Sequence, residues 1–117
     1  MKKIITLLLL SFFVSVYGQA SENEYEKIFS SKNVIVDVRG PSEYATGHID
    51  KAVNIPINKI RKEIKNFAPD KEQTIVVYCL SGKRAEYAAK KLKEMGYTNV
   101  INAGKYKDLK ELEEKQK

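Results

Sequence analysis

The chain contains a single cysteine, Cys79, at a position where a thiol would be chemically activated. The residues before it, 75–78, are Ile-Val-Val-Tyr, a β-branched and aromatic run that predicts a buried strand ending at the cysteine. From Ala85 onward, small and apolar residues recur at helical spacing, which predicts a helix. Cys79 is therefore expected in a loop between a strand and a helix, where it would contribute little to core packing.

A loop of this kind stabilises negative charge at the cysteine sulfur. Its backbone N–H groups point inward, and the helix that follows adds the positive end of its dipole. Lys83 and Arg84 add two cationic side chains next to the loop. These features favour the thiolate, which is the nucleophilic form of cysteine, so the sequence predicts nucleophilic chemistry at Cys79.

Strands and helices alternate along the predicted chain around this loop. Strands are expected over residues 34–38, 52–55, 75–79 and 97–101, and helices over residues 22–31, 41–45, 58–67, 85–95 and 108–117. Asn58 is expected to cap its helix, whose apolar stripe would consist of Ile57, Ile60, Ile64 and Phe67. Residues 102–104, Asn-Ala-Gly, are expected to form a turn after the last strand, at the same edge of a parallel sheet as Cys79.

Four blocks of the sequence resemble the rhodanese family of sulfurtransferases. The first is Cys79-x-x-Gly82-x-Arg84 after a hydrophobic strand and before an Ala-rich helix, which resembles the family's active-site loop. The others, in the order found in the family, span residues 34–39, 43–56 and 95–104. The resemblance covers residues 34 to 112 and implies an α/β fold, with an open parallel sheet of four to five strands and helices on both faces, in a single domain.

The resemblance implies a sulfurtransferase in which Cys79 carries a sulfane sulfur as a persulfide. The donor would be thiosulfate or a similar small anion, the acceptor would be thiophilic, and no cofactor or metal would be needed. Substrate binding is expected at the residues of the loop, with Arg84 either contacting the substrate or holding the loop; these residues are Leu80, Ser81, Gly82, Lys83 and Arg84.

Four further residues are expected to support the site rather than to bind substrate. Asp37 and Arg39, at a predicted strand end near Glu43, are expected to form a structural ion pair and loop hydrogen bonds. His48 is the only histidine of the chain and could act as a base for Cys79. In its Gly-His-Ile context it resembles a family position that organises a loop, and we expect that structural role.

The start of the chain predicts export. Residues 1–20 combine a basic beginning with an apolar run of about 14 residues, shorter than the roughly 20 that a membrane-spanning helix needs, so they are expected to be a signal peptide cleaved near Gly18 or Ala20. Residues 21–117 would then form a single periplasmic or otherwise exported domain, soluble after cleavage and without a stable membrane anchor. The net charge is +6 with dispersed lysines, which indicates solvated surface charge rather than nucleic-acid binding, and we expect a monomer.

Other functions of a reactive cysteine fit the sequence less well. A phosphatase or arsenate reductase of related fold uses Cys-x5-Arg, whereas Cys79 and Arg84 give Cys-x4-Arg. A dithiol oxidoreductase would need a second cysteine, which the chain lacks. The main alternative is a non-catalytic rhodanese-like module that binds a partner. The physiological donor and acceptor, the oligomeric state and the role of Arg84 are left open by the sequence.

Overall fold

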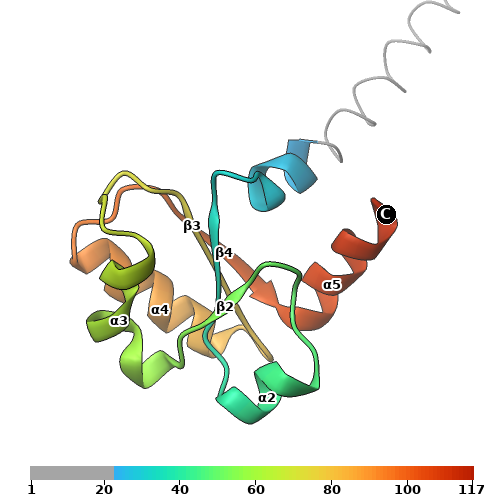
Figure 1. Ribbon diagram of the computed structural model, residues 1–117, viewed down its shortest axis with the longest axis horizontal. Helices are drawn as coiled ribbons and strands as arrows, with labels where there is room; N and C mark the ends of the chain where they lie inside the picture. The colour runs from blue at the N-terminus through green and yellow to red at the C-terminus, as the bar shows by residue number, and fades with distance from the viewer. Residues whose placement is uncertain (1–22) are drawn as a thin grey trace, which may run out of the picture.

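The computed structural model describes residues 23–117, which form a single α/β domain around a parallel sheet. Within this part of the chain the sheet has four strands in the order β2-β1-β3-β4 (Figure 1). The prediction of four to five strands is confirmed at its lower value. The edge strand β2 is short, as predicted. The strands are β1 (Val34–Asp37), β2 (Val53–Asn54), β3 (Ile75–Cys79) and β4 (Val100–Lys105).

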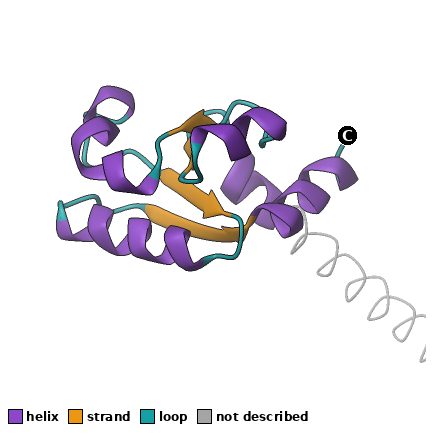
Figure 2. Ribbon diagram, turned by 90° about the horizontal axis from the view of Figure 1, so that it is seen from below, coloured by secondary structure: helices purple, strands orange, loops and turns teal. Residues whose placement is uncertain are grey.

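Helices cover both faces of the sheet, as predicted (Figure 2). One face packs on α3 and α4, and the other on α5 and on the helix over residues 23–29. Two further short helices connect strands at one edge of the sheet. The remaining bounds are α2 (Pro41–Thr46), the 3-10 helix η1 (Ile57–Lys59), α3 (Ile60–Phe67), α4 (Lys83–Glu94) and α5 (Tyr106–Lys115).

The central strand β3 explains why the two cores are separate. All of its residues are buried, because helices cover it on both sides. Successive side chains of a strand point to opposite faces, so Val77 and Cys79 join the core under α3 and α4, while Val76 and Tyr78 join the core under α5. The cysteine therefore faces the first turn of α4.

The carboxyl ends of the parallel strands meet at one edge of the sheet. This edge carries Asp37 at the end of β1, Cys79 at the end of β3 and Lys105 at the end of β4. The helices α2, α4 and α5 begin close behind these strand ends, so their N-termini lie at the same edge. Ligands of open α/β sheets bind at such an edge, which makes it the place to look for a site.

The predictions for β4 were wrong in their bounds. The strand begins at Val100 rather than at residue 97, and residues 102–104 belong to the strand instead of forming a turn. Asn-Ala-Gly is typical of a turn, but here a bulge accommodates it: Val77 pairs with Asn102 and Tyr78 pairs with Gly104. Gly104 has φ +76°, a conformation that glycine adopts without strain.

Two details of the predicted helix over residues 58–67 were also wrong. Asn58 makes no capping hydrogen bond, because the helical turn of η1 already begins at Ile57 and Asn58 lies inside it. Phe67 is 44% exposed, so it does not complete the apolar stripe. Ile60 and Ile64 are the stripe residues that α3 buries in the core.

The predicted signal peptide, residues 1–20 with cleavage near Gly18 or Ala20, lies outside the described residues and stays a prediction. No helix within residues 23–117 is long and apolar enough to cross a membrane.

Candidate active site

The Cys79 sulfur lies in a cradle of backbone N–H groups at the start of α4. Its Sγ accepts hydrogen bonds from the N–H of Gly82 (3.0 Å) and of Ala85 (3.3 Å). Gly82 has φ +98°, which bends the loop back over the sulfur. Cys79 is fully buried in the core under α4, so the expectation that it contributes little to packing was wrong: the loop and the first turn of α4 close over it.

The first turn of α4 leaves N–H groups free for an anion. The first backbone bond of the helix runs from Glu86 N to the Gly82 carbonyl (3.0 Å), so the N–H groups of Lys83 and Arg84 have no acceptor within the helix. The helix dipole places positive potential at the same point. The arrangement can therefore stabilise negative charge on the Cys79 sulfur and on a group bound just outside it.

Arg84 is bound to α2 by a bidentate ion pair. Its Nη1 and Nη2 donate to Oε1 (2.8 Å) and Oε2 (3.0 Å) of Glu43, and Oε1 also accepts from the Gly40 N–H (3.0 Å). The Arg84 guanidinium, together with the Gly40 N–H, lowers the pKa of Glu43 from 4.5 to about 2. Of the two roles left open for Arg84, these contacts favour holding the loop, because both terminal nitrogens are engaged by the carboxylate.

Asp37 and Arg39 form a buried ion pair behind the loop. Arg39 donates from Nη2 to Asp37 Oδ2 (2.7 Å) and from its own backbone N–H to Oδ1 (2.9 Å). The side-chain hydrogen bond to Asp37 and the negative charge of that carboxylate raise the pKa of Arg39. The same Nη2 donates to the Gly47 carbonyl (2.6 Å). Tyr78, whose pKa is raised by burial, donates to Asp37 Oδ2 (2.8 Å) and accepts from the Ile49 N–H (3.0 Å). These hydrogen bonds connect the segment after α2, at Gly47 and Ile49, to the strand ends of the sheet. Such contacts agree with the structural role that was expected for Asp37 and Arg39.

His48 makes the contacts of a residue that organises a loop. Its ring stacks on the Tyr44 ring with centroids 3.7 Å apart, and its Nδ1 lies 2.8 Å from the Tyr44 carbonyl oxygen. Both contacts join the segment after α2 to Tyr44 in that helix. Neither of them involves Cys79.

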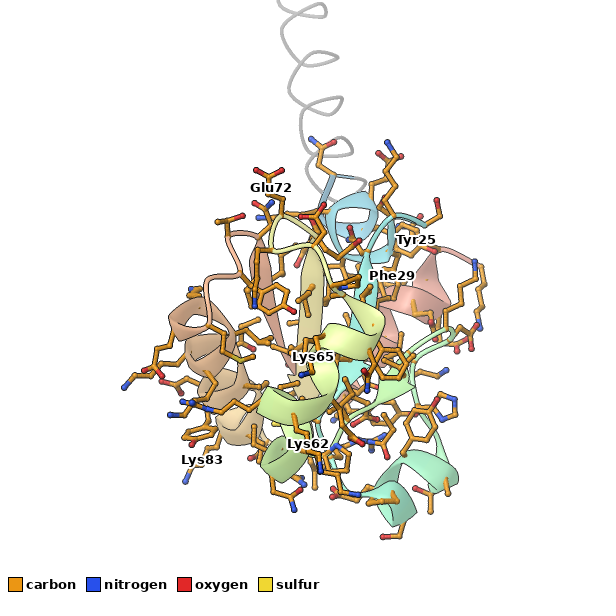
Figure 3. The ribbon with its side chains drawn as sticks, turned by 60° about the vertical axis from the view of Figure 1, so that its left-hand side comes forward. Tyr25, Phe29, Lys62, Lys65, Glu72 and Lys83 are labelled. Carbon is orange, nitrogen blue, oxygen red and sulfur yellow. The ribbon has the colours of Figure 1, made fainter. Side chains whose placement is uncertain are left out.

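The remaining predicted site residues lie on the outside of the loop. Leu80 is 56% exposed, and Ser81 and Lys83 are also exposed. Lys83 extends outward from the start of α4 (Figure 3). The hydrogen bonds to the Cys79 sulfur come from Gly82 and Ala85 and not from these three residues.

The predicted site residues did not include Lys105 and Tyr106, which also lie at this edge. Lys105 Cγ is the atom nearest to the position a Cβ would occupy on Gly82, at 4.0 Å. The Tyr106 ring lies 4.4 Å from the Arg39 guanidinium carbon, and its hydroxyl approaches Gly47 so closely that a Cβ there would be 3.0 Å away. The register that places Lys105 opposite Cys79 depends on the bulge, which the sequence did not reveal.

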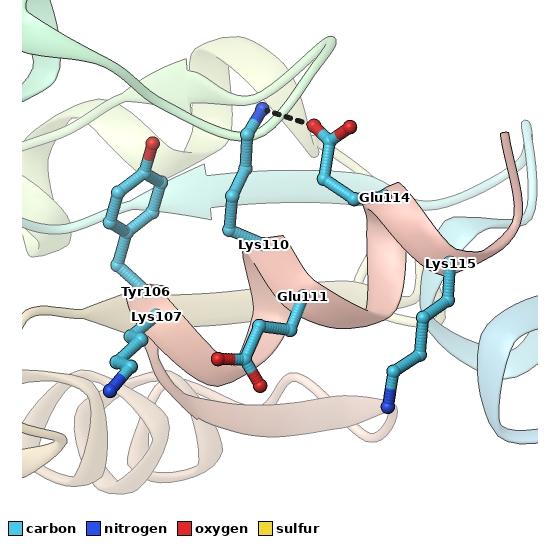
Figure 4. A pocket seen from close by; sticks show the side chains of 6 residues that line it. All are labelled: Tyr106, Lys107, Lys110, Glu111, Glu114 and Lys115. Atoms are coloured by element: carbon cyan, nitrogen blue, oxygen red, sulfur yellow. Dashed lines mark ion pairs between the residues drawn. The ribbon is translucent and has the colours of Figure 1, made fainter.

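A hollow of about 510 Å³ lies along α5 (Figure 4). It contains no residue of the Cys79 loop, so it is not part of the candidate site. The described residues that line the hollow are Tyr106, Lys107, Lys110, Glu111, Glu114 and Lys115.

Within residues 23–117, no group of three or more His, Cys, Asp and Glu side chains could hold a metal ion.

A family model described as Rhodanese-like domain matches residues 21–111. The chain is 43% identical to thiosulfate sulfurtransferase PspE of Escherichia coli (strain K12) over 74 residues, which are 63% of this chain and 71% of that protein. It is 32% identical to a putative mitochondrial thiosulfate sulfurtransferase of Schizosaccharomyces pombe, with 82% of each chain covered.

Solved structures agree with these matches. The fold is similar to that of a rhodanese with anions from E. coli, with a TM-score of 0.63 and 42% identity over 65% of this chain and 89% of that one.

Other relatives carry a different name, tRNA uridine(34) hydroxylase. The protein of that name from Buchnera aphidicola subsp. Baizongia pistaciae is 34% identical over 68% of this chain. The match covers 27% of that longer protein, so the likeness is to one part of it.

Proposed function

Because the chain belongs to the rhodanese-like domain family, we propose that it transfers a sulfane sulfur from thiosulfate, or a similar anionic donor, to a thiophilic acceptor through a persulfide on Cys79. The observation that carries the proposal is the cradle at Cys79, where two backbone N–H groups donate to the sulfur at the start of α4. The relatives named thiosulfate sulfurtransferase support the choice of donor.

In the first half of the proposed reaction, the Cys79 thiolate attacks the outer sulfur of thiosulfate. A new S–S bond forms to Cys79, the S–S bond of the donor breaks, and sulfite leaves with the bonding electron pair. The negative charge then lies on the outer sulfur of the persulfide. The N–H groups of Lys83 and Arg84, which have no acceptor within α4, are available to stabilise that charge.

In the second half, an acceptor such as cyanide attacks the outer sulfur of the persulfide. The cyanide takes up that sulfur and leaves as thiocyanate. The S–S bond of the persulfide breaks, and Cys79 keeps its bonding electron pair and is again a thiolate. No proton needs to be moved in either half, which fits a site where His48 is bound elsewhere. A thiol acceptor is a second possibility, since one relative in Saccharomyces cerevisiae, 36% identical, is named thiosulfate:glutathione sulfurtransferase.

The test is the intact mass of the protein before and after thiosulfate, and again after cyanide. We expect a gain of about 32 Da, the mass of one sulfur atom, that cyanide reverses. Cys79→Ser is the control and should gain nothing, because a hydroxyl neither ionises near neutral pH nor forms a persulfide. A folded wild-type protein that never gains sulfur would favour a rhodanese-like module that binds a partner without catalysis.

We also propose that the protein acts outside the cytoplasm, as an exported monomer without a stable membrane anchor. The apolar run near the N-terminus is shorter than a membrane span and follows Lys2 and Lys3, which supports a cleaved signal peptide. N-terminal sequencing of the protein from its native host should find a start near residue 19 or 21. Material that retains Met1 and stays with the membrane would contradict the proposal.

A further inference from the structure

The bulge in β4 decides which residue lies opposite the cysteine. Val77 of β3 pairs with Asn102, but Cys79, two residues further along, pairs with Lys105. Without the bulge the register would have placed Gly104 opposite Cys79. The bulge therefore replaces a residue that has no side chain with a lysine at the position beside the nucleophile.

The Lys105 side chain runs along the loop that covers the sulfur. Paired residues of neighbouring strands project from the same face of a sheet, so Lys105 lies on the Cys79 side. The contact with the loop agrees: Lys105 Cγ is 4.0 Å from the Cβ position on Gly82, the residue whose N–H donates to the Cys79 sulfur. The stem of the lysine thus passes next to the cradle.

Lys105 differs from Arg84 in how its charge is balanced. The charge of Arg84 is neutralised by the bidentate contact with Glu43. Lys105 is exposed and forms no ion pair with any carboxylate in residues 23–117. Its positive charge is therefore available to a molecule that reaches the loop.

We infer that Lys105 is a specificity-determining residue, which favours anionic over uncharged reactants at Cys79. Its role in selecting a sulfur donor rests on the proposed function, whereas its electrostatic effect on reactions of the thiol does not. The substrate class that follows is a small anion such as thiosulfate, attracted by a cation that the bulge brings to the cysteine.

The charge effect can be measured with two alkylating reagents of similar size. Iodoacetate is anionic and iodoacetamide is neutral, and Cys79 is the only cysteine of the chain, so each reaction reports on one thiol. We expect Lys105→Met to lower the ratio of the iodoacetate rate to the iodoacetamide rate by about threefold at low ionic strength, and salt to diminish this difference. Lys105→Arg should retain the wild-type ratio.

Lys65→Met is the matched control, because it removes the same charge from an exposed lysine on α3 (Figure 3). It should leave the ratio unchanged. An unchanged ratio in Lys105→Met, or an equal decrease in both variants, would overturn the inference. A wild-type thiol that reacts with neither reagent would overturn it as well, because a sulfur closed to small reagents cannot select among them.

A second measurement extends the test to sulfur transfer. The ratio of the kcat/KM for thiosulfate to the rate constant for iodoacetamide, a neutral reagent that reacts at the same sulfur, should fall about threefold in Lys105→Met and be retained in Lys105→Arg. Equal losses with both reagents would indicate a structural role and overturn the inference. If wild-type protein gains no sulfur from thiosulfate while the alkylation ratio still depends on Lys105, the proposed function fails and the charge effect stands.

Discussion

Replacing Glu43 with glutamine tests whether the ion pair with Arg84 holds the Cys79 loop in place. The substitution keeps the size of the side chain and removes its charge. Glu43 accepts two bonds from Arg84 and one from the Gly40 N–H, and these contacts set its pKa at about 2 instead of 4.5. A neutral amide can replace neither the charge nor both acceptor oxygens.

The expected loss of stability follows from that pKa. Taken in full, the difference between 4.5 and about 2 would correspond to about 3 kcal/mol. However, the side chains of Arg84 and Glu43 are 34% and 32% exposed, and solvent screens a pair that is open to this extent. We therefore expect Glu43→Gln to lower the free energy of unfolding by about 1 kcal/mol at pH 7.

The pH dependence of this loss has a definite sign. The carboxyl has a lower pKa in the folded chain than in the unfolded one, so its contribution is complete well above pH 4.5 and is lost as the pH falls toward 2. Urea unfolding of Glu43→Gln and wild type should therefore differ by about 1 kcal/mol at pH 7, and by progressively less below about pH 4.5.

Glu72→Gln serves as the control, because Glu72 is exposed and its side chain forms no ion pair within residues 23–117. It should change stability by less than about 0.5 kcal/mol at any of these pH values. Two results would refute the stabilising role of the Arg84–Glu43 pair. One is an equal free energy of unfolding for Glu43→Gln and wild type at pH 7, and the other is a difference that stays constant down to pH 2.5.

Three further substitutions test other parts of the site. Gly82→Ala should cost roughly 1–3 kcal/mol in urea unfolding and reduce sulfur uptake measured by intact mass, because alanine is strained at φ +98°. Asp37→Asn should lower the free energy of unfolding by about 3–5 kcal/mol, because it leaves the charge of Arg39, which is 3% exposed, without its partner; a loss below about 1 kcal/mol would contradict this. Lys83→Ala should raise the KM for thiosulfate about twofold and flatten its salt dependence, without changing stability; an unchanged salt profile would remove Lys83 from the site.

The parts of the fold that the sequence predicted are those with a strong local pattern. The run before Cys79 is continuous and apolar because β3 is covered on both faces, and the spacing after Gly82 is helical because α4 buries one side. The ion pair of Asp37 and Arg39 was predictable because the two residues are close in sequence and end a strand. In each case the physical cause acts over a few residues.

What the sequence did not predict depends on contacts between distant residues. Glu113 belongs to a helix of alternating acids and lysines, yet it is only 4% exposed, because it accepts from the Asp50 N–H (3.0 Å) and from Lys110 (2.9 Å). Nothing in its neighbourhood along the chain distinguishes it from Glu111 or Glu114, which are exposed. The bulge in β4 is a similar case, since the register depends on how β4 meets β3.

The complete burial of Cys79 changes how the loop must work during sulfur transfer. A donor cannot reach a sulfur that the loop and α4 cover, so part of the cover has to move, and the contacts of each part indicate which. The α4 side is fixed by the ion pair of Arg84 with Glu43 and by the packing of Ala85. Among residues 23–117, no ion pair fixes the Leu80 side: the Leu80 side chain is 56% exposed, and the residue precedes the turn at Gly82. Opening at Leu80 would expose the sulfur while the N–H groups of the first helical turn stay in place to receive the charge.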